Sequence, residues 1–197
     1  MDAVSLALIT GLGWTSGLRF YAVLFVLGAL QRSGFYMLPA SLELLAHPWV
    51  IAVSGLLCIT EFFTDKIPGV DTVWDAIHTF IRIPGGALLA AAAVIDSDPG
   101  LALAAALLGG TIAAGAHFTK SGSRALINLS PEPFSNWAAS LTEDMLALAA
   151  LWTMLKYPLL FLGLLVLFLL TVLWLLPRLW RGIRRMFANL AGGARRS

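Results

Sequence analysis

Long stretches without a charged residue constrain the fold of this chain more than any other feature. Residues 159–176 carry no charge and lie between Pro158 and Pro177, and residues 99–119 form a second uncharged stretch. A helix needs about 20 apolar residues to cross the hydrocarbon layer of a bilayer. Charged residues make up 12% of the chain, against about 25% in soluble domains. The sequence therefore excludes a soluble enzyme and a disordered chain, and predicts an integral membrane protein.

Further apolar segments raise the predicted number of membrane crossings. They are residues 3–30, 44–60, 83–95 and 134–155. Residues 83–95 are short and cross only if the helix begins upstream of them. We therefore predict an all-α, polytopic bundle of about six transmembrane segments over residues 1–177, with no basic signal sequence before it. The single cysteine, Cys58, excludes an intrachain disulfide and a thiolate metal cluster.

Basic residues predict the orientation. Residues 178–197 contain six arginines and no acidic residue, which is typical of an amphipathic cytoplasmic tail that binds anionic lipid headgroups rather than nucleic acid. With six spans, the inner loops would add Lys66, Arg82, Lys120 and Arg124 to these arginines. Only Arg32 and Lys156 would then lie outside. The positive-inside rule thus predicts a multi-pass protein of the inner cell membrane with both termini in the cytoplasm.

A short repeat suggests an internal symmetry. Residues 16–19 (SGLR) recur as residues 121–124 (SGSR), each after a glycine-rich apolar stretch. Two inverted halves of three helices, as in secondary transporters, would explain this pattern, and so would a chance similarity. The weak helix formers at residues 10–17 also predict a break in the first helix near Arg19. Free backbone N–H groups and a guanidinium at such a break suit an anion.

Three charged residues fall inside predicted spans, namely Arg19, Glu143 and Asp144. Each ionised side chain at the bilayer centre costs about 2.5–3.5 kcal/mol, so we expect all three to face the bundle interior. Helical spacing places Asn136, Ser140 and Glu143 on one stripe, continued by Ala147 and Ala150. Two interpretations are open: a functional midplane site, or a structural ion pair between Arg19 and one of the two acids.

A second polar group follows the second apolar segment. It comprises Glu61, Asp65 and Lys66, and then Asp71, Asp75, His78 and Arg82 at helical spacing i, i+4, i+7 and i+11. Three interpretations are open for this stripe: the solvated face of an interfacial helix, a proton or ion pathway, or a metal site. His47 and His117 are both expected at the membrane interface.

Several of these motifs together resemble a known family. The stretches are SGLR at residues 16–19, EFFTDKIPGVD at residues 61–71, and Trp74-Asp75 followed by Ile77-His78-Thr79. Over residues 5–155 the chain resembles a bacterial membrane family known as domain of unknown function 4126. This resemblance implies a membrane protein, and it brings no activity, substrate or cofactor with it.

The sequence favours a transporter or channel for a small solute or ion, with proton coupling as one option. The expected pathway residues are Arg19, Glu61, Asp65, Lys66, Asp71, Asp75, His78, Asn136, Glu143 and Asp144. One alternative is a membrane-embedded enzyme that acts on a lipid or polyprenyl headgroup through a metal held by Asp71, Asp75 and His78. Another is a non-catalytic assembly factor. No cofactor or catalytic residue is expected, and small-residue helices would permit a homo-oligomer.

Overall fold

The computed structural model describes residues 2–129, 133–171 and 173–174, and every regular element in these residues is a helix. The elements are α1 (Ala3–Arg32), the 3-10 helix η1 (Ala40–Ala46), α2 (Pro48–Thr64), α3 (Val70–Ala92), α4 (Pro99–Ile127), α5 (Pro133–Lys156) and a further apolar helix, Pro158–Thr171. The prediction of an all-α protein is confirmed. The predicted basic tail at residues 178–197 lies outside the described residues.

Local sequence signals set the helix boundaries. Asp2 caps α1 by accepting a hydrogen bond from the Ser5 N–H at 2.8 Å, and this bond lowers the pKa of the Asp2 carboxyl. Asp98 caps α4 in the same way, and both α2 and α4 begin with a proline. Gly69, at φ +85°, makes the turn from α2 into α3. The short apolar segment 83–95 is predicted to cross the membrane only if its helix begins upstream. The structure agrees, because α3 runs without a break from Val70 to Ala92.

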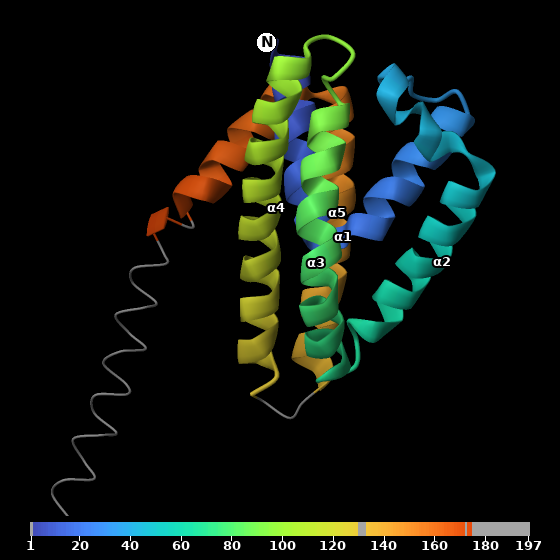
Figure 1. Cartoon of the computed structure of the whole chain (residues 1–197). Helices are drawn as coiled ribbons and strands as arrows, with labels where there is room; N and C mark the ends of the chain where they lie inside the picture. The colour runs from blue at the N-terminus through green and yellow to red at the C-terminus, as the bar shows by residue number, and fades with distance from the viewer. Residues whose placement is uncertain (1, 130–132, 172, 175–197) are drawn as a thin grey trace, which may run out of the picture.

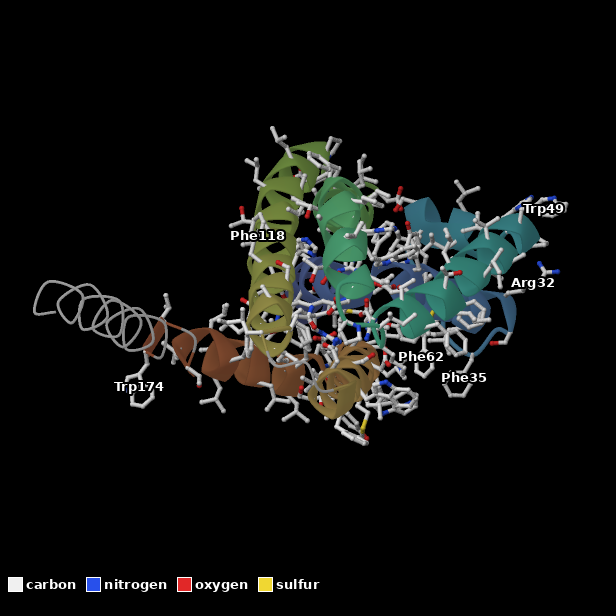
Figure 2. The ribbon with its side chains drawn as sticks, turned by 90° about the horizontal axis from the view of Figure 1, so that it is seen from below. Arg32, Phe35, Trp49, Phe62, Phe118 and Trp174 are labelled. Atoms are coloured by element: carbon white, nitrogen blue, oxygen red, sulfur yellow. The ribbon has the colours of Figure 1, made fainter. Side chains whose placement is uncertain are left out.

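The polarity of the bundle is inverted relative to that of a soluble protein. Large apolar side chains on the outer faces are exposed, including Phe80, Trp49 and Phe118, whereas Arg19 and Arg82 are almost fully buried. Figure 2 shows Phe118 and Trp49 directed away from the bundle. Soluble proteins almost never bury unpaired charges while exposing a continuous apolar surface. The protein is therefore membrane-embedded.

The described residues contain three helices long and apolar enough to cross a membrane: α1, α4 and the α5 segment Phe134–Lys156. The pair η1 and α2, bent by 68° at the break between them, would make a fourth. The Pro158–Thr171 helix is shorter than a full span within the described part of the chain. The structure thus supports a polytopic helical membrane protein.

The first helix is interrupted, as predicted, and the interruption lies at Arg19 itself. This residue has φ −142° and ψ 70°, which are not helical values. Before it, α1 packs closely on α4: a Cβ placed on Gly13 would lie 2.5 Å from the carbonyl oxygen of Gly109, and Gly17 lies against Ala113. Because residue numbers rise together along both helices, the first half of α1 runs parallel to α4.

The second half of α1 turns back along α2. Phe25 lies against Gly55, and Gly28 lies against Ile51, so these two segments are antiparallel. The following η1 docks on the turn between α3 and α4, where the Ser41 N–H donates to Asp96 at 2.9 Å. Both ends of α1 therefore lie at the end of the bundle that carries this turn, which we call the upper end. The elbow of α1 at Arg19 therefore points away from the upper end, and we call the opposite end, where α2 meets α3, the lower end (Figure 1).

Candidate functional site: a buried charge network

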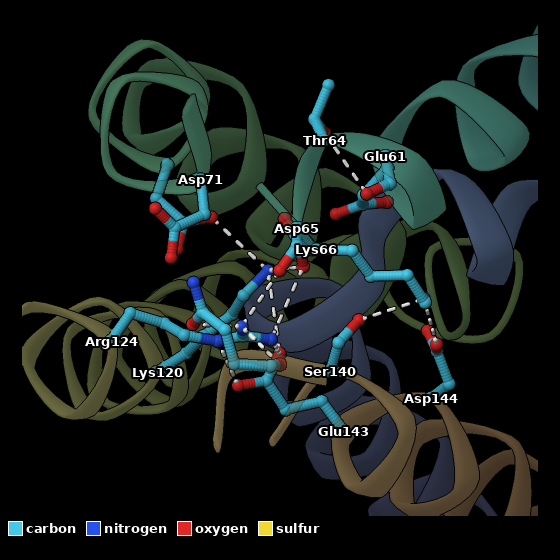
Figure 3. A network of polar contacts seen from close by, with 12 residues as sticks. Glu61, Thr64, Asp65, Lys66, Asp71, Lys120, Arg124, Ser140, Glu143 and Asp144 are labelled. Atoms are coloured by element: carbon cyan, nitrogen blue, oxygen red, sulfur yellow. Dashed lines mark hydrogen bonds and ion pairs between the residues drawn. The ribbon is translucent and has the colours of Figure 1, made fainter. Parts of the chain in front are cut away.

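Ten ionisable side chains form one continuous network between the helices toward the lower end of the bundle. Its members are the cations Arg19, Lys66, Arg82, Lys120 and Arg124, and the carboxylates Glu61, Asp65, Asp75, Glu143 and Asp144. Five positive and five negative charges balance, so the network carries no net charge when all members are ionised. Figure 3 shows how side chains from several helices converge there.

Arg19 joins α1 to α2 and α5. Its guanidinium forms an ion pair with Asp65, lies 2.8 Å from Asp144 and 3.5 Å from Glu143, and donates to the Ser140 carbonyl oxygen at 3.1 Å. The side chain is only 2% exposed. The predicted pairing of Arg19 with the two acids of α5 is therefore observed, and Asp65 is an additional partner.

Two cations from α4 link Arg19's partners to one another. Lys120 Nζ lies 2.7 Å from Asp65 and 3.2 Å from Asp75. Arg124 holds both carboxylate oxygens of Glu143, at 3.0 and 2.8 Å, in the bidentate geometry that makes such pairs strong. Asp65 is thus shared between α1 and α4.

The burial of four basic residues corrects the predicted cytoplasmic loops. Lys66, Arg82, Lys120 and Arg124 were expected in water at the inner surface, but all four are buried in the network. Each lies opposite a carboxylate from another segment, which offsets the cost of removing its charge from water. The predicted orientation therefore depends on the arginines of residues 178–197, outside the described residues.

Arg82 forms the upper part of the network, with Glu61 and with Asp75 at 2.7 Å. It also donates to Nδ1 of His117 at 3.3 Å. Because a guanidinium can only donate, Nδ1 must accept, and the His117 proton lies on Nε2, 2.7 Å from the Thr79 hydroxyl oxygen. Thr79 in turn donates to the Asp75 carbonyl oxygen. His117 is therefore a neutral, buried member of a hydrogen-bond chain, and its predicted interfacial position is wrong.

The polar stripe of α3 faces the bundle interior. Asp71, Asp75, His78 and Arg82 share one face, as their spacing predicts, and all are buried. The opposite face exposes Val73, Ile77, Phe80 and Ile81. The interpretation of this stripe as a solvated helix face is therefore wrong, because partners on other helices satisfy its charges.

The stripe predicted on α5 is observed. Asn136, Ser140, Ala147 and Ala150 are buried, while Trp137 and Leu148 are exposed. Ser140 accepts a hydrogen bond from Lys66 Nζ at 3.2 Å, and Asn136 accepts one from Arg124 at 3.0 Å. The buried face of α5, which carries Asn136 and Ser140, thus contacts the cations of the network.

Asp71 is attached to the network through two asparagines. Its carboxylate accepts from Asn128 Nδ2 at 2.9 and 3.0 Å, and Asn136 Nδ2 donates to Asn128 Oδ1 at 2.9 Å. Asn128 follows α4, in a segment where the sequence indicates only a loop. Asp71 itself makes none of the network's ion pairs among the described residues.

The three residues of the predicted metal site do not converge. His78 stacks on Trp74 and places Nδ1 2.7 Å from the Trp74 carbonyl oxygen, while Asp71 binds Asn128 and Asp75 binds Arg82. No group of three His, Cys, Asp or Glu side chains in the described ranges is arranged to hold a metal ion. The geometry therefore gives no support to metal chemistry at these residues.

Within the described residues, four network carboxylates keep one oxygen without a hydrogen-bond donor. These oxygens are Glu61 Oε2, Asp65 Oδ1, Asp75 Oδ2 and Asp144 Oδ2, and all four are buried. Buried carboxylate oxygens are normally hydrogen-bonded. These four oxygens are therefore unused acceptors in the interior of the network.

The two ends of the network differ in accessibility. The side chains of Asp144 and Glu143 are 23% and 12% exposed, whereas those of Glu61 and Arg82 are at most 1% exposed. The network is thus open at its α5 end and closed around Arg82.

Comparison with known proteins gives the family of the chain. A family model described as "Domain of unknown function (DUF4126)" matches residues 6–178. The chain belongs to this family. The match confirms the resemblance and corrects its extent, because the DUF4126 region also covers the last apolar stretch, which the resemblance left out. The chain matches no curated protein and no solved structure, so the function of this DUF4126 protein is argued from its network.

Proposed function

We propose that this DUF4126 protein is a membrane transporter or channel for protons or another small ion, with the charge network as its pathway. The observation that carries this proposal is the set of four buried carboxylate oxygens that have no donor in the described part of the chain. In a network of balanced charges, these oxygens are the sites where an additional proton or cation would be accepted. Intramembrane ionisable groups of this kind commonly mark ion and proton pathways.

The broken first helix supports the same proposal. Many transporters build their central site from discontinuous helices whose exposed backbone ends bind charge. Here the first half of α1 ends with the Leu18 carbonyl oxygen 3.5 Å from Lys120 Nζ, and the next residue is the Arg19 elbow. The helix break thus contributes both backbone and side-chain groups to the network.

The connectivity indicates the order of sites along the pathway. An ion entering at Asp144 would meet Arg19 and Asp65 next, and then Lys120 and Asp75. The final group, Glu61 with Arg82, is closed off from the surface. Transport then requires a second conformation in which the Arg82 end opens and the Asp144 end closes.

We infer a membrane arrangement that differs from six alternating spans. Since α1 returns to the upper end, we place five crossings in α2, α3, α4, α5 and the apolar stretch of the sequence that begins at Pro158, with α1 entering and leaving on one side. The positive-inside rule, applied to the arginines in the sequence of residues 178–197, then predicts a cytoplasmic lower end and an N-terminus outside the cell membrane. The parallel packing of α1 on α4 argues against an inverted repeat of these two helices.

A structural lock is the second candidate, and the complete charge balance of the network favours it. Ion pairs join the helices α1 to α5, and a set of charges that cancels could serve only to fix their positions. A non-catalytic assembly factor would need no more than this. The two candidates differ in whether the network moves ions.

Proton flux into proteoliposomes tests the proposal. Asp144→Asn keeps the size of the side chain and removes the charge at the open end of the network, so we expect the flux to fall to that of protein-free liposomes. Glu43→Gln is the matched control, because Glu43 is exposed in η1, and this variant should conduct like the wild type. Wild-type proteoliposomes without flux of protons, Na⁺ or K⁺ above protein-free liposomes would favour the lock instead.

A further inference from the structure

Lys66 has the weakest ion pair of the network cations. Its Nζ lies 3.9 Å from Asp144 Oδ2, and this is the one ion pair that Lys66 makes within the described residues. Each of the other four cations lies within 2.8 Å of a carboxylate oxygen. Groups other than Asp144 therefore hold the Lys66 ammonium group in its place.

Neutral groups hold this ammonium group. It donates to the Phe62 carbonyl oxygen at 3.0 Å and to the Ser140 hydroxyl oxygen at 3.2 Å, and it lies 3.1 Å from the centroid of the Phe62 ring. The face of an aromatic ring attracts a cation. The last carbonyls of a helix lack partners within it, and the Lys66 N–H donates to Phe63 instead of Phe62. The end of α2 and Ser140 thus set the position of the ammonium group.

The neighbours of Lys66 Nζ form a site for one monovalent cation. A carbonyl, a hydroxyl and a carboxylate oxygen lie within 3.9 Å of Nζ, and hard oxygen ligands of this kind bind metal cations. An ammonium group is similar in size to K⁺. Figure 3 shows Lys66 directed toward Ser140 and Asp144. The chain therefore supplies its own cation to this site.

The site lies at the open end of the network. The side chain of Asp144 is 23% exposed, with Lys66 beside one carboxylate oxygen and Arg19 2.8 Å from the other. A metal ion that leaves water needs several oxygen ligands, and Lys66 already occupies the ones offered here. A proton needs a single oxygen. The open end thus favours a proton over a metal ion.

We propose that Lys66 determines the ion specificity of the pathway: its ammonium group fills the cation site at the open end, so the transported ion is the proton and not Na⁺ or K⁺. This inference rests on the proposed function, which leaves the ion open. It gives Lys66 a role in selection, beyond neutralising Asp144. Removing the ammonium group would leave the three oxygens free to bind a metal cation.

Cation-dependent stability of the full chain in detergent tests the site without a measurement of flux. For Lys66→Ala, KCl or NaCl should raise the unfolding temperature by about 3 °C relative to N-methylglucamine chloride at equal ionic strength, because a bound ion stabilises the folded state. The wild type should show no such difference. Lys156→Ala is the matched control, because Lys156 is an exposed lysine outside the network, and it should behave like the wild type.

Lys66→Gln is the second variant in case Lys66→Ala does not fold, and the same response to K⁺ or Na⁺ is expected of it. A folded Lys66 variant without this response, or a wild type with an equal response, would overturn the proposal. Wild-type proteoliposomes that conduct Na⁺ or K⁺ as well as protons would also overturn it, and would leave the proposed function intact. Absence of all ion flux would contradict the proposed function itself.

Discussion

Arg19 and Arg82 are two of the largest fully buried side chains in the described part of the chain, and both are cations. An isolated ionised group at the bilayer centre costs about 2.5–3.5 kcal/mol. Here each cation of the network lies within ion-pair distance of at least one carboxylate. Removing one member would leave its partner charged and buried, which costs more than the pair itself contributes.

Arg82→Met tests this cost. Arg82 supplies the one ion pair that Glu61 makes within the described residues, so the variant leaves the Glu61 carboxylate unpaired. We expect the free energy of unfolding in detergent to fall by about 3–5 kcal/mol. Arg32→Met is the control, because Arg32 is exposed and makes one long hydrogen bond to Ala46, at 3.4 Å. Equal stability of the two variants would contradict the burial of Arg82 in the network.

The sequence predicts some members of the network and misses others. Arg19, Glu143 and Asp144 are predictable because they fall inside apolar segments, where a charge requires a partner. Lys120 and Arg124 fall near the end of such a segment, where a cation in the headgroup layer looks the same in sequence as one inside the bundle. Their spacing with His117, at i, i+3 and i+7, is the signal that indicates a shared helix face.

At the scale of elements, close packing holds the two halves of α1 in place. Glycines let the first half of α1 approach the α4 backbone, and large side chains from α1 fill the space beside α2 and α3. For example, Phe20 occupies the space next to Gly85, and Phe25 lies beside Gly55. The elbow is therefore fixed by contacts on both sides as well as by the ion pairs of Arg19.

Gly17→Ala tests the close approach of α1 and α4. A Cβ at residue 17 would lie 2.8 Å from the Ala116 Cβ and closer still to the Ala113 carbonyl oxygen, so we expect a loss of about 1–3 kcal/mol in unfolding free energy. Gly115→Ala, on α4, is the control because nothing lies within 4 Å of its added Cβ. Since alanine favours helices, this control should be neutral or more stable. The reverse order of stabilities would exclude the packing of α1 on α4.

Helical periodicity predicts which residues share a face, but not what the face contacts. The stripes on α3 and α5 follow from spacing alone. Whether the α3 stripe meets water or protein depends on Lys120 and His117 of α4, more than 30 residues further along the chain. The break in α1 is likewise predictable from glycines, whereas its reversal depends on packing against two different helices.

At the scale of the whole molecule, the reversal of α1 is the reason for proposing five crossings in place of six. The chain of contacts from α1 to α4 and from η1 to the α3–α4 turn places the N-terminal end of α1 at the upper end. Six alternating spans would instead place the N-terminus opposite this turn. The proposed number of crossings thus depends on packing as well as on the count of apolar segments.

Labelling with a membrane-impermeant maleimide distinguishes the two topologies. In a Cys58→Ala background, we expect Val4→Cys and Ser97→Cys to react from one side of the membrane, and Leu129→Cys from the other. All three native side chains are exposed, so reactivity should report the side of the membrane and not burial. Labelling of Val4→Cys from the same side as Leu129→Cys would show that α1 crosses the membrane.

The central claim is that the charge network conducts ions and does more than hold helices together. The double variant Lys66→Met and Asp144→Leu removes one cation and one carboxylate that lie 3.9 Å apart, so the network stays neutral. Replacing a buried ion pair by apolar side chains is often neutral for stability. The account predicts a folded protein whose proton flux in liposomes is that of lipid alone. A folded double variant with wild-type flux would contradict it.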